Sequence, residues 1–376
     1  MKNDSTPVPF LDLSREYAEI ASEIEPAVLD VLRSQAYVLG PAVARFETEI
    51  ASHLGVEHAI GVSSGSDAVL LALAALDIGP GDQVVTSPFT FFATVSAITR
   101  LGAEPVFADI APDDYLLDPE QVERVATDRT RAIVPVQLYG QCVDPAAFDA
   151  TARKRRIPIV EDAAQAIGAR RAGVGAGAFG DLGCFSFYPT KNLAAVGEAG
   201  LVTTSDERLA ARVRRLRDHG SERRYEHLEV GWNARLDAIQ AAALSVKLAH
   251  LDAWTAARVT NAARYGELFR AAGLAGTLTL PSVAVDATHV FHQYVVRAPR
   301  RDELQAHLAA EGVGCSIHYP KPIHLQPCFE SLGYRPGDLP ESERAAAEVL
   351  ALPIFPQLRP EELERVVEAI ASFYRG

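Results

Sequence analysis

The sequence predicts an α/β fold in which a mostly parallel sheet is covered by helices and followed by a smaller C-terminal α/β domain. Three observations lead to this prediction. From about residue 56 to residue 205, short apolar runs alternate with longer helical runs. The short runs are apolar almost throughout, which is typical of strands buried on both faces. After residue 205 the chain turns helical, and a second, shorter alternation follows.

The elements of the larger unit follow from this alternation in chain order. Gly-Pro-Gly at residues 79–81 ends the first helix, and Asp118 followed by Pro119 suits a helix start. Strands are expected at 58–64, 83–89, 105–110, 132–140, 157–163, 181–189 and 199–206, with helices at 65–82, 92–102, 118–128 and 144–156.

The second half begins with a long helical region. It covers residues 205–221 and continues through 236–273. A strand at 291–298, a helix at 301–312, a strand at 314–320 and a terminal helix at 360–376 form the smaller unit. We therefore predict two domains, 1–250 and 251–376, with the first thirty residues packed against one of them.

Composition narrows the class of function. Of 376 residues, 48% are hydrophobic and 23% charged, and 36 Lys+Arg against 49 Asp+Glu give a net charge of −13. An acidic chain without a basic tract argues against nucleic acid or an anionic membrane as a partner. The four cysteines show no metal-binding spacing, so we expect reduced thiols, no metal site and a cytoplasmic protein. No signal peptide and no transmembrane run are expected.

Three features lie where predicted strands end, the edge at which parallel α/β sheets bind ligands. The first is SSGSDA, Ser63–Ala68, whose small residues precede an apolar helix. Free N–H groups at such a helix start can bind an anion. The alternative is an ordinary N-cap with Asp67 in the first turn.

The second feature is the carboxylate pair Glu161 and Asp162, directly after an apolar strand. Strand alternation prevents both from pointing the same way. One could cap a helix, whereas the other would face the strand-end pocket and need a cationic partner. Gln165 lies three residues further on. Capping alone remains the alternative.

The third feature is FSFYPTKN, in which Ser186 and Lys191 stand at and beyond a strand end. A desolvated lysine there would have a lowered pKa and could act as a nucleophile. A solvated loop lysine is the alternative. An anion cradle, a carboxylate and an amine together suit pyridoxal 5′-phosphate (PLP), with an aromatic cover from Phe89, Phe91 or Phe92.

These motifs together resemble the DegT/DnrJ/EryC1/StrS sugar aminotransferases, a branch of the fold-type I PLP enzymes. The likeness runs from PFLDL at 9–13 to LPIFPQL at 352–358. In family order stand SGSDA, FTFFAT, VQLYGQ, VEDAAQAIGA, FSFYPTKN and GWNARLDAIQAA. After the lysine the family usually reads close to GAYGDGG, whereas this chain has AAVGEAG at 194–200, which puts local loop contacts in question but not the chemistry.

The resemblance implies a role for each matching residue. Lys191 would be the Schiff-base lysine and proton carrier, and Asp162 would pair with the pyridine nitrogen. In the same way Gln165 would contact the ring hydroxyl, Phe91 would stack on the ring, Gly65, Ser66 and Ser186 would hold the phosphate, and Asn233 would reach the phosphate of the neighbouring subunit. A homodimer with shared active sites follows. Family members with histidine at the lysine position perform dehydration, which Lys191 argues against.

The resemblance also implies the substrates: L-glutamate as amino donor and a nucleotide-linked keto sugar as acceptor. The segment Ser316–Tyr334 resembles members that aminate C-3 of a 3-keto nucleotide sugar. Substrate contacts are expected from His318, Tyr319 and His324, and from Arg224 and Tyr225 toward the diphosphate. The alternatives are that His318 and Tyr319 stand at a strand end, that His324 is a partly buried histidine in a turn, and that Arg224 and Tyr225 lie at a solvated helix end. A 4-keto-sugar or cyclitol aminotransferase and a non-enzymatic PLP-binding regulator remain alternative functions.

Overall fold

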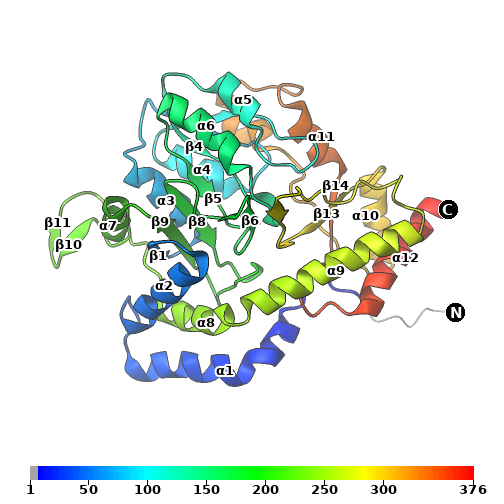
Figure 1. The fold of residues 1–376 in the computed structure, drawn as a ribbon, viewed down its shortest axis with the longest axis horizontal. Coiled ribbons are helices and arrows are strands. Elements are labelled where there is room, and N and C mark those ends of the chain that lie inside the picture. The colour runs from blue at the N-terminus through cyan, green and yellow to red at the C-terminus, as the bar shows by residue number, and fades with distance from the viewer. Residues whose placement is uncertain (1–6) are drawn as a thin grey trace.

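The computed structural model describes residues 7–376, and a twisted sheet forms its centre (Figure 1). Two groups of strands, in the orders β1-β9-β8-β5 and β3-β2-β4, are joined by isolated parallel bridges from Ile133 to Ile159 and from Val136 to Asp162. The strands are β1 (His58–Val62), β2 (Gln83–Thr86), β3 (Glu104–Phe107), β4 (Thr130–Val134), β5 (Val160–Asp162), β8 (Leu182–Ser186) and β9 (Gly200–Thr204).

Only β9 runs against the other strands of this array, so the predicted, mostly parallel sheet is confirmed. Its antiparallel course has a consequence for the site. β9 begins at Gly200, beside the last residues of β1 and β8, because Gly200 pairs with Val62 and with Ser186. The carboxyl ends of β1, β2, β4, β5 and β8 therefore share one edge of the sheet.

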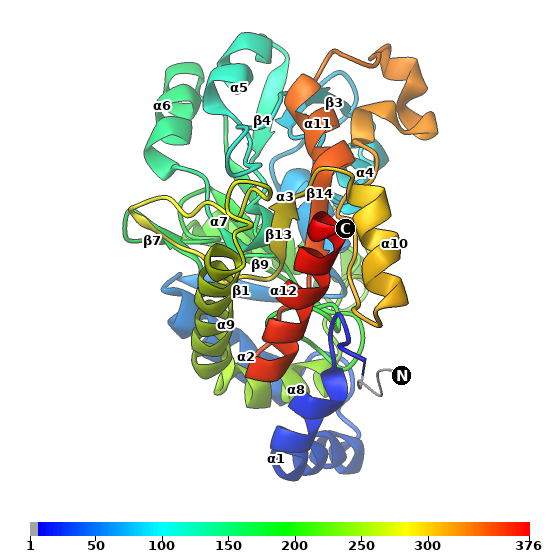
Figure 2. The ribbon, with the colours of Figure 1, turned by 90° about the vertical axis from the view of Figure 1, so that its right-hand side faces the viewer.

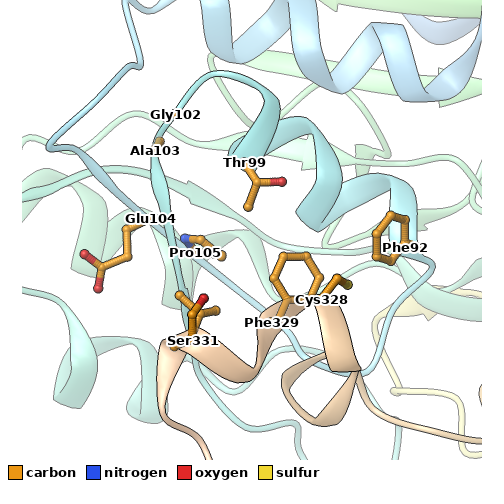
Figure 3. Close-up of a pocket in the computed structure, with 10 residues that line it drawn as sticks. Phe92, Thr99, Gly102, Ala103, Glu104, Pro105, Cys328, Phe329 and Ser331 are labelled. Carbon is orange, nitrogen blue, oxygen red and sulfur yellow. The ribbon is translucent and has the colours of Figure 1, made fainter.

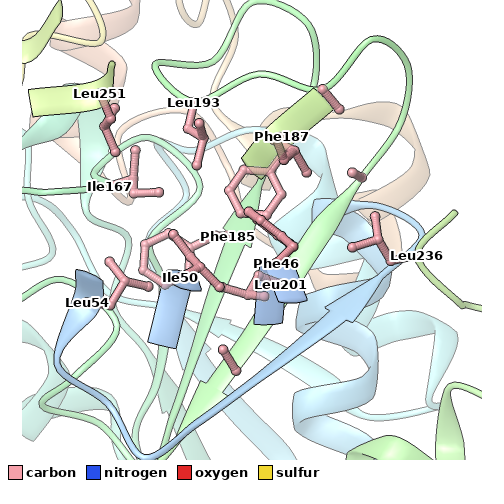
Figure 4. Packing of buried hydrophobic residues seen from close by; sticks show 14 of the residues in the cluster. Phe46, Ile50, Leu54, Ile167, Phe185, Phe187, Leu193, Leu201, Leu236 and Leu251 are labelled. Carbon is pink, nitrogen blue, oxygen red and sulfur yellow. The ribbon is translucent and has the colours of Figure 1, made fainter. Parts of the chain in front are cut away.

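Helices cover both faces of the sheet, as the apolar strands predict. On one face Phe185 and Leu201 pack against Phe46 of α2 (Pro41–Leu54), and α8 (Ala238–Leu248) lies over the same cluster (Figure 4). Alternate strand residues, such as Val202, face the other side. There α3 (Gly65–Ala75), almost wholly buried, packs with α4 (Phe92–Arg100) and α7 (Glu207–Leu216). Helices α5 (Pro119–Val125) and α6 (Pro145–Arg155) cluster with Val85 of β2 and Ile133 of β4, on the face opposite α3.

The C-terminal part forms its own apolar cluster. It contains residues between Ala262 and Ala371, together with Val8, which bridges to Val313. Its elements are α9 (Leu251–Ala271), β13 (Tyr294–Arg297), α10 (Arg301–Ala310), α11 (Pro340–Glu348), β14 (Val349–Leu352) and α12 (Pro360–Arg375). Helix α12 lies between α9 and α10 (Figure 2). The N-terminal helix α1 (Leu13–Ser34) packs along α8. The division at residue 250 stays a prediction.

Two sequence predictions are corrected. The long helical region after residue 205 is interrupted by a hairpin of β10 (Ser221–Arg223) and β11 (Glu226–His227), which projects from the body in Figure 1. The strand expected at 314–320 is reduced to one bridge, between Ser316 and Ala351, on the side of β14 that faces away from β13, because the start of this segment bonds to Val8 instead. Short pieces missed by the pattern are β6 (Arg170–Arg171), β7 (Val174–Gly175), β12 (Ala287–Thr288), η1 (Leu138–Gly140), η2 (Ile323–Leu325) and η3 (Pro327–Leu332).

Within residues 7–376, no helix combines the length and the apolar character needed to cross a membrane.

Candidate active site

The start of α3 lies against the end of β8. Ser64 is the N-cap, and its hydroxyl accepts from the backbone N–H of Asp67 over 3.1 Å. Ser64 is therefore an ordinary N-cap, which was the alternative to an anion site in this segment. A capped helix start still has free N–H groups in its first turn, so capping and anion binding are compatible at this position.

Two glycines allow these elements to approach each other closely. A Cβ on Gly65 would lie 2.5 Å from the Cβ of Ser186, and one on Gly200 would lie 2.3 Å from the carbonyl oxygen of Ser64. Only glycine fits such close backbone approaches. They bring the N–H groups of Gly65 and Ser66 to the side of Ser186, as a small anion such as a phosphate requires.

Asp162 ends β5 with its carboxylate buried at the same edge. Oδ2 accepts from the hydroxyl of Thr94 over 2.7 Å, and Oδ1 accepts from the N–H of Ala164 over 3.2 Å. Burial raises the pKa of Asp162, and these bonds and the charge of Lys191 oppose that rise. Thr94, on the first turn of α4, was missed by sequence reasoning. Its position in FTFFAT, opposite a strand-end aspartate, is the signal that could have found it.

Glu161 points the other way, as strand alternation requires. Its carboxylate accepts from the side-chain amide of Gln137 and from the N–H groups of Gly177, Phe179 and Gly180, over 2.8–3.0 Å. These bonds fix the turn that leads into β8. Neither carboxylate caps a helix, because turns and not a helix follow β5.

Gln165 connects the chain after β5 with two tyrosines. Its Oε1 accepts from the N–H of Tyr139 over 2.7 Å, and its Nε2 donates to the hydroxyl of Tyr319 over 3.1 Å. The hydroxyl of Tyr139 donates to the carbonyl of His318. Tyr139, in VQLYGQ, is a second residue of this cluster that sequence reasoning did not single out.

Lys191 follows β8 and is half-buried at this edge. Desolvation lowers its pKa to about 8, although the negative charge of Asp162 acts in the opposite direction. An amine with such a pKa is partly neutral near pH 8, which a solvated loop lysine is not. The pKa of His318 is lowered to about 4, by burial and by the charge of Lys191, so this imidazole is neutral.

The other predicted residues lie at different places. Phe91 is 58% exposed, with its ring centre 6.1 Å from that of Tyr319, so it stands at the mouth of the cluster. Asn233 is exposed after the hairpin, while Arg224 stacks on the exposed ring of Tyr225 at the hairpin tip. His324 is buried beside Phe107 and Tyr334, and its Nε2 lies 3.2 Å from Glu343.

A hollow of about 350 Å³ lies between α4, β3 and η3 (Figure 3). Phe92, Pro105 and Phe329 line it, whereas Asp162 and Lys191 do not. Among residues 7–376, no group of His, Cys, Asp and Glu side chains is placed to hold a metal ion. All four cysteines are free thiols.

Comparison with known proteins gives consistent matches along the chain. A model of the DegT/DnrJ/EryC1/StrS aminotransferase family matches residues 18–371. A pleiotropic regulatory protein of Geobacillus stearothermophilus is 49% identical over 369 residues, 98% of this chain and 99% of that protein. A dTDP-3-amino-3,4,6-trideoxy-alpha-D-glucose transaminase of Streptomyces venezuelae is 46% identical over 97% of this chain and 96% of its own. The crystal structure of S. venezuelae DesV in complex with a ketimine intermediate superposes with a TM-score of 0.95, at 44% identity, covering 99% of this chain and 100% of that one.

Proposed function

Because the chain belongs to the DegT/DnrJ/EryC1/StrS aminotransferase family, we propose that it is a PLP-dependent transaminase that delivers an amino group to a nucleotide-linked 3-keto sugar. One observation carries the chemical part of this proposal. A buried carboxylate, Asp162, and an amine of lowered pKa, Lys191, lie at the same strand edge as the glycine-lined anion cradle.

The residues present fit PLP. The N–H groups of Gly65 and Ser66 and the hydroxyl of Ser186 would hold the phosphate, because the close approach at Gly65 brings them together. Asp162 would pair with the ring nitrogen, and Phe91 has a free face on which the ring would stack. Gln165, held by Tyr139 and Tyr319, would meet the ring hydroxyl.

The bound cofactor supplies an electron-accepting ring that stabilises negative charge at the Cα of an amino acid. Asp162 would keep a proton on the ring nitrogen, because a buried carboxylate without a cationic partner is costly. Lys191 is the covalent anchor and the general base. Its neutral amine would take the proton from Cα of the donor amino acid and hold it for return. The pKa of about 8 leaves a usable fraction of neutral amine near neutral pH.

The acceptor is a C-3 keto sugar on a nucleoside diphosphate, and the donor is L-glutamate. His318 and Tyr319 lie beside Gln165 and Lys191, within the cluster that would face the sugar. The buried place of His324, with its bond to Glu343, favours a supporting role for this residue in the 323–334 segment. The 4-keto-sugar and cyclitol alternatives differ in product, so product analysis with 3-keto and 4-keto dTDP-sugars separates them.

A homodimer with shared sites completes the proposal. Asn233, Arg224 and Tyr225 are exposed on or next to the projecting hairpin, where they would reach the partner's cofactor phosphate and substrate diphosphate. Apolar side chains that a partner could cover are also exposed, among them Tyr37, Val38, Leu228 and Val230. A cytoplasmic location stays a prediction.

A second candidate function is regulation without catalysis, which the name of the Geobacillus stearothermophilus relative suggests. Mixing purified protein with L-glutamate distinguishes the two. A transaminase changes the absorbance of its bound cofactor and releases 2-oxoglutarate in one half-reaction. A regulator binds the cofactor but releases no keto acid. A protein that shows no cofactor absorbance at all, even after incubation with PLP, refutes both.

A further inference from the structure

The chain just before β13, residues 289–293, passes beside two loops of the site. The N–H of Val290 donates to the carbonyl of Gly140 over 2.9 Å, and that of Gln293 donates to the carbonyl of Tyr139 over 3.3 Å. A Cβ on Gly140 would lie 2.9 Å from Cγ2 of Val290. This segment, which we call the 289–293 strap, is therefore pressed against the turn that holds Gln165.

The strap also contacts the residue next to Lys191. Asn192 is 7% exposed, and its Nδ2 donates to the carbonyl of Val290 over 3.0 Å, while its Oδ1 lies 3.1 Å from Nδ1 of His292. Because a carbonyl only accepts, the first bond fixes which end of the amide is which. Oδ1 of Asn192 then requires a donor, so Nδ1 of His292 carries the proton.

The surroundings of His292 agree with this assignment. Burial and the charges of Lys191 and Arg258 hold its pKa well below the ordinary value, so the imidazole is neutral and has one N–H. The other ionisable rings near it, His289 and His318, also have lowered pKa values and are neutral. The single N–H of His292 is thus committed to Asn192.

The strap itself is fixed to the C-terminal part of the chain. Arg258, buried on α9, donates from the same nitrogen to the carbonyls of Phe291, over 3.1 Å, and Ile354, over 2.8 Å. A guanidinium with two backbone acceptors leaves the strap little freedom. The strap therefore offers a rigid surface against which the loop after β8 is held.

We propose that His292 is a positioning residue for Lys191: its Nδ1–H orients Asn192, and Asn192 bonds the lysine's own loop to the 289–293 strap. His292 acts through Asn192 and not on the substrate. The consequence for catalysis rests on the proposed function, in which the Lys191 amine must meet a reacting carbon, and a displacement of about 1 Å costs on the order of a hundredfold in rate.

Two substitutions test the hydrogen bond. His292→Ala removes the donor and is expected to lower kcat about 10- to 100-fold, with KM for L-glutamate changed less than about threefold. His292→Asn places an amide N–H near the former Nδ1 and is expected to restore kcat to within about threefold of the wild type. The matched control is His289→Ala, which removes a buried ring of the same strap that bonds to Phe291 and not to Asn192.

A second measurement does not depend on transamination. Acetic anhydride labelling of the full chain, stripped of cofactor and followed by mass spectrometry across pH, reports the titration of the Lys191 amine. In His292→Ala, water entering the loosened loop is expected to move the Lys191 midpoint upward from about 8, while His289→Ala leaves it unchanged.

The outcomes separate this inference from the proposed function. If the wild type lacks transaminase activity but the labelling shift appears, the positioning role stands and the function is wrong. The positioning role is overturned if His292→Ala and His289→Ala change kcat and the labelling midpoint equally. It is also overturned if His292→Asn, folded as judged by circular dichroism, is as impaired as His292→Ala.

Discussion

Thr94 donates its hydroxyl proton to Oδ2 of Asp162 over 2.7 Å, and this bond is wholly buried. It joins the first turn of α4 to the end of β5, two elements 68 residues apart in the chain. A hydrogen bond to a buried carboxylate stabilises the charged form, which here must persist against the desolvation that raises the pKa of Asp162.

Thr94→Val is therefore expected to raise the pKa of Asp162 further. A bond to a charged group contributes about 1.5–3 kcal/mol, so kcat/KM should fall about 10- to 100-fold. The acid limb of its pH profile should move to higher pH, because the carboxylate is protonated earlier. Ser96→Ala is the control, since that hydroxyl bonds to the Ala93 carbonyl on the same helix. An unmoved acid limb in Thr94→Val would refute this role.

Glu161 and Asp162 are adjacent, but substitution of Glu161 should reduce stability, whereas substitution of Asp162 should reduce activity. Glu161→Gln sets an amide NH₂ against N–H donors of the 177–180 turn and should lower the free energy of unfolding by about 2–4 kcal/mol. Activity per folded molecule should survive. Asp162→Asn should keep the fold and lose at least about a hundredfold in kcat. Urea unfolding and steady-state assays on both variants measure this, and equal stability losses would contradict the separate roles.

The lowered pKa of Lys191 should appear in the stability of the cofactor-free protein. Because its folded pKa is about 8 and its ordinary value 10.5, the unfolded chain binds more protons between these pH values. The free energy of unfolding therefore rises with pH through that window, and the full penalty applies below it. Lys191→Met should stabilise the cofactor-free chain at about pH 7 by about 1–2 kcal/mol, discounted because the amine is only half-buried.

The control for that experiment is Lys321→Met, at an exposed lysine. Urea midpoints compared at about pH 7 and about pH 10 should show the gain of Lys191→Met shrinking with rising pH. A loss of stability in Lys191→Met at neutral pH would mean that the amine is better solvated or better paired than its surroundings indicate.

A shared active site can be tested by complementation. Lys191→Ala and Asn233→Ala should each be nearly inactive alone. Mixed by denaturation and refolding in equal amounts, they should recover about a quarter of the wild-type activity, because half of the dimers then contain one intact site. In the control, Lys191→Ala is mixed in the same way with Arg153→Ala, a substitution on an exposed face of α6. Failure of the two inactive variants to recover activity would place Asn233 in its own subunit's site or outside any site.

Much of the fold could be predicted because the segments that become buried are apolar in sequence. Strands such as β2 and β4 and the helix α3 are apolar almost throughout, which the local sequence shows directly. Pairing is not local. The antiparallel course of β9 and the position of β14 between β13 and Ser316 depend on which segments meet in the folded chain.

The residues of the site also fall into those that local motifs reveal and those that depend on distant partners. Lys191, Asp162 and the start of α3 stand in short motifs at strand ends, where sequence reasoning can find them. Thr94, Tyr139 and Asn192 act through partners 26 to 179 residues away, and single hydrogen bonds of this kind leave no periodic pattern. The split roles of Glu161 and Asp162 follow from strand alternation, and the family resemblance assigned Asp162 to the site. The partners of Glu161 in the 177–180 turn required the structure.

Borohydride reduction tests most directly whether Lys191 is the amine that carries PLP. Purified wild-type protein, incubated with PLP, reduced and digested, should yield one modified peptide by mass spectrometry, with the cofactor on Lys191. The same treatment of Lys191→Ala should leave that peptide unmodified. A stable adduct on another lysine, such as Lys247 or Lys321, or no adduct on the wild type, would contradict the account.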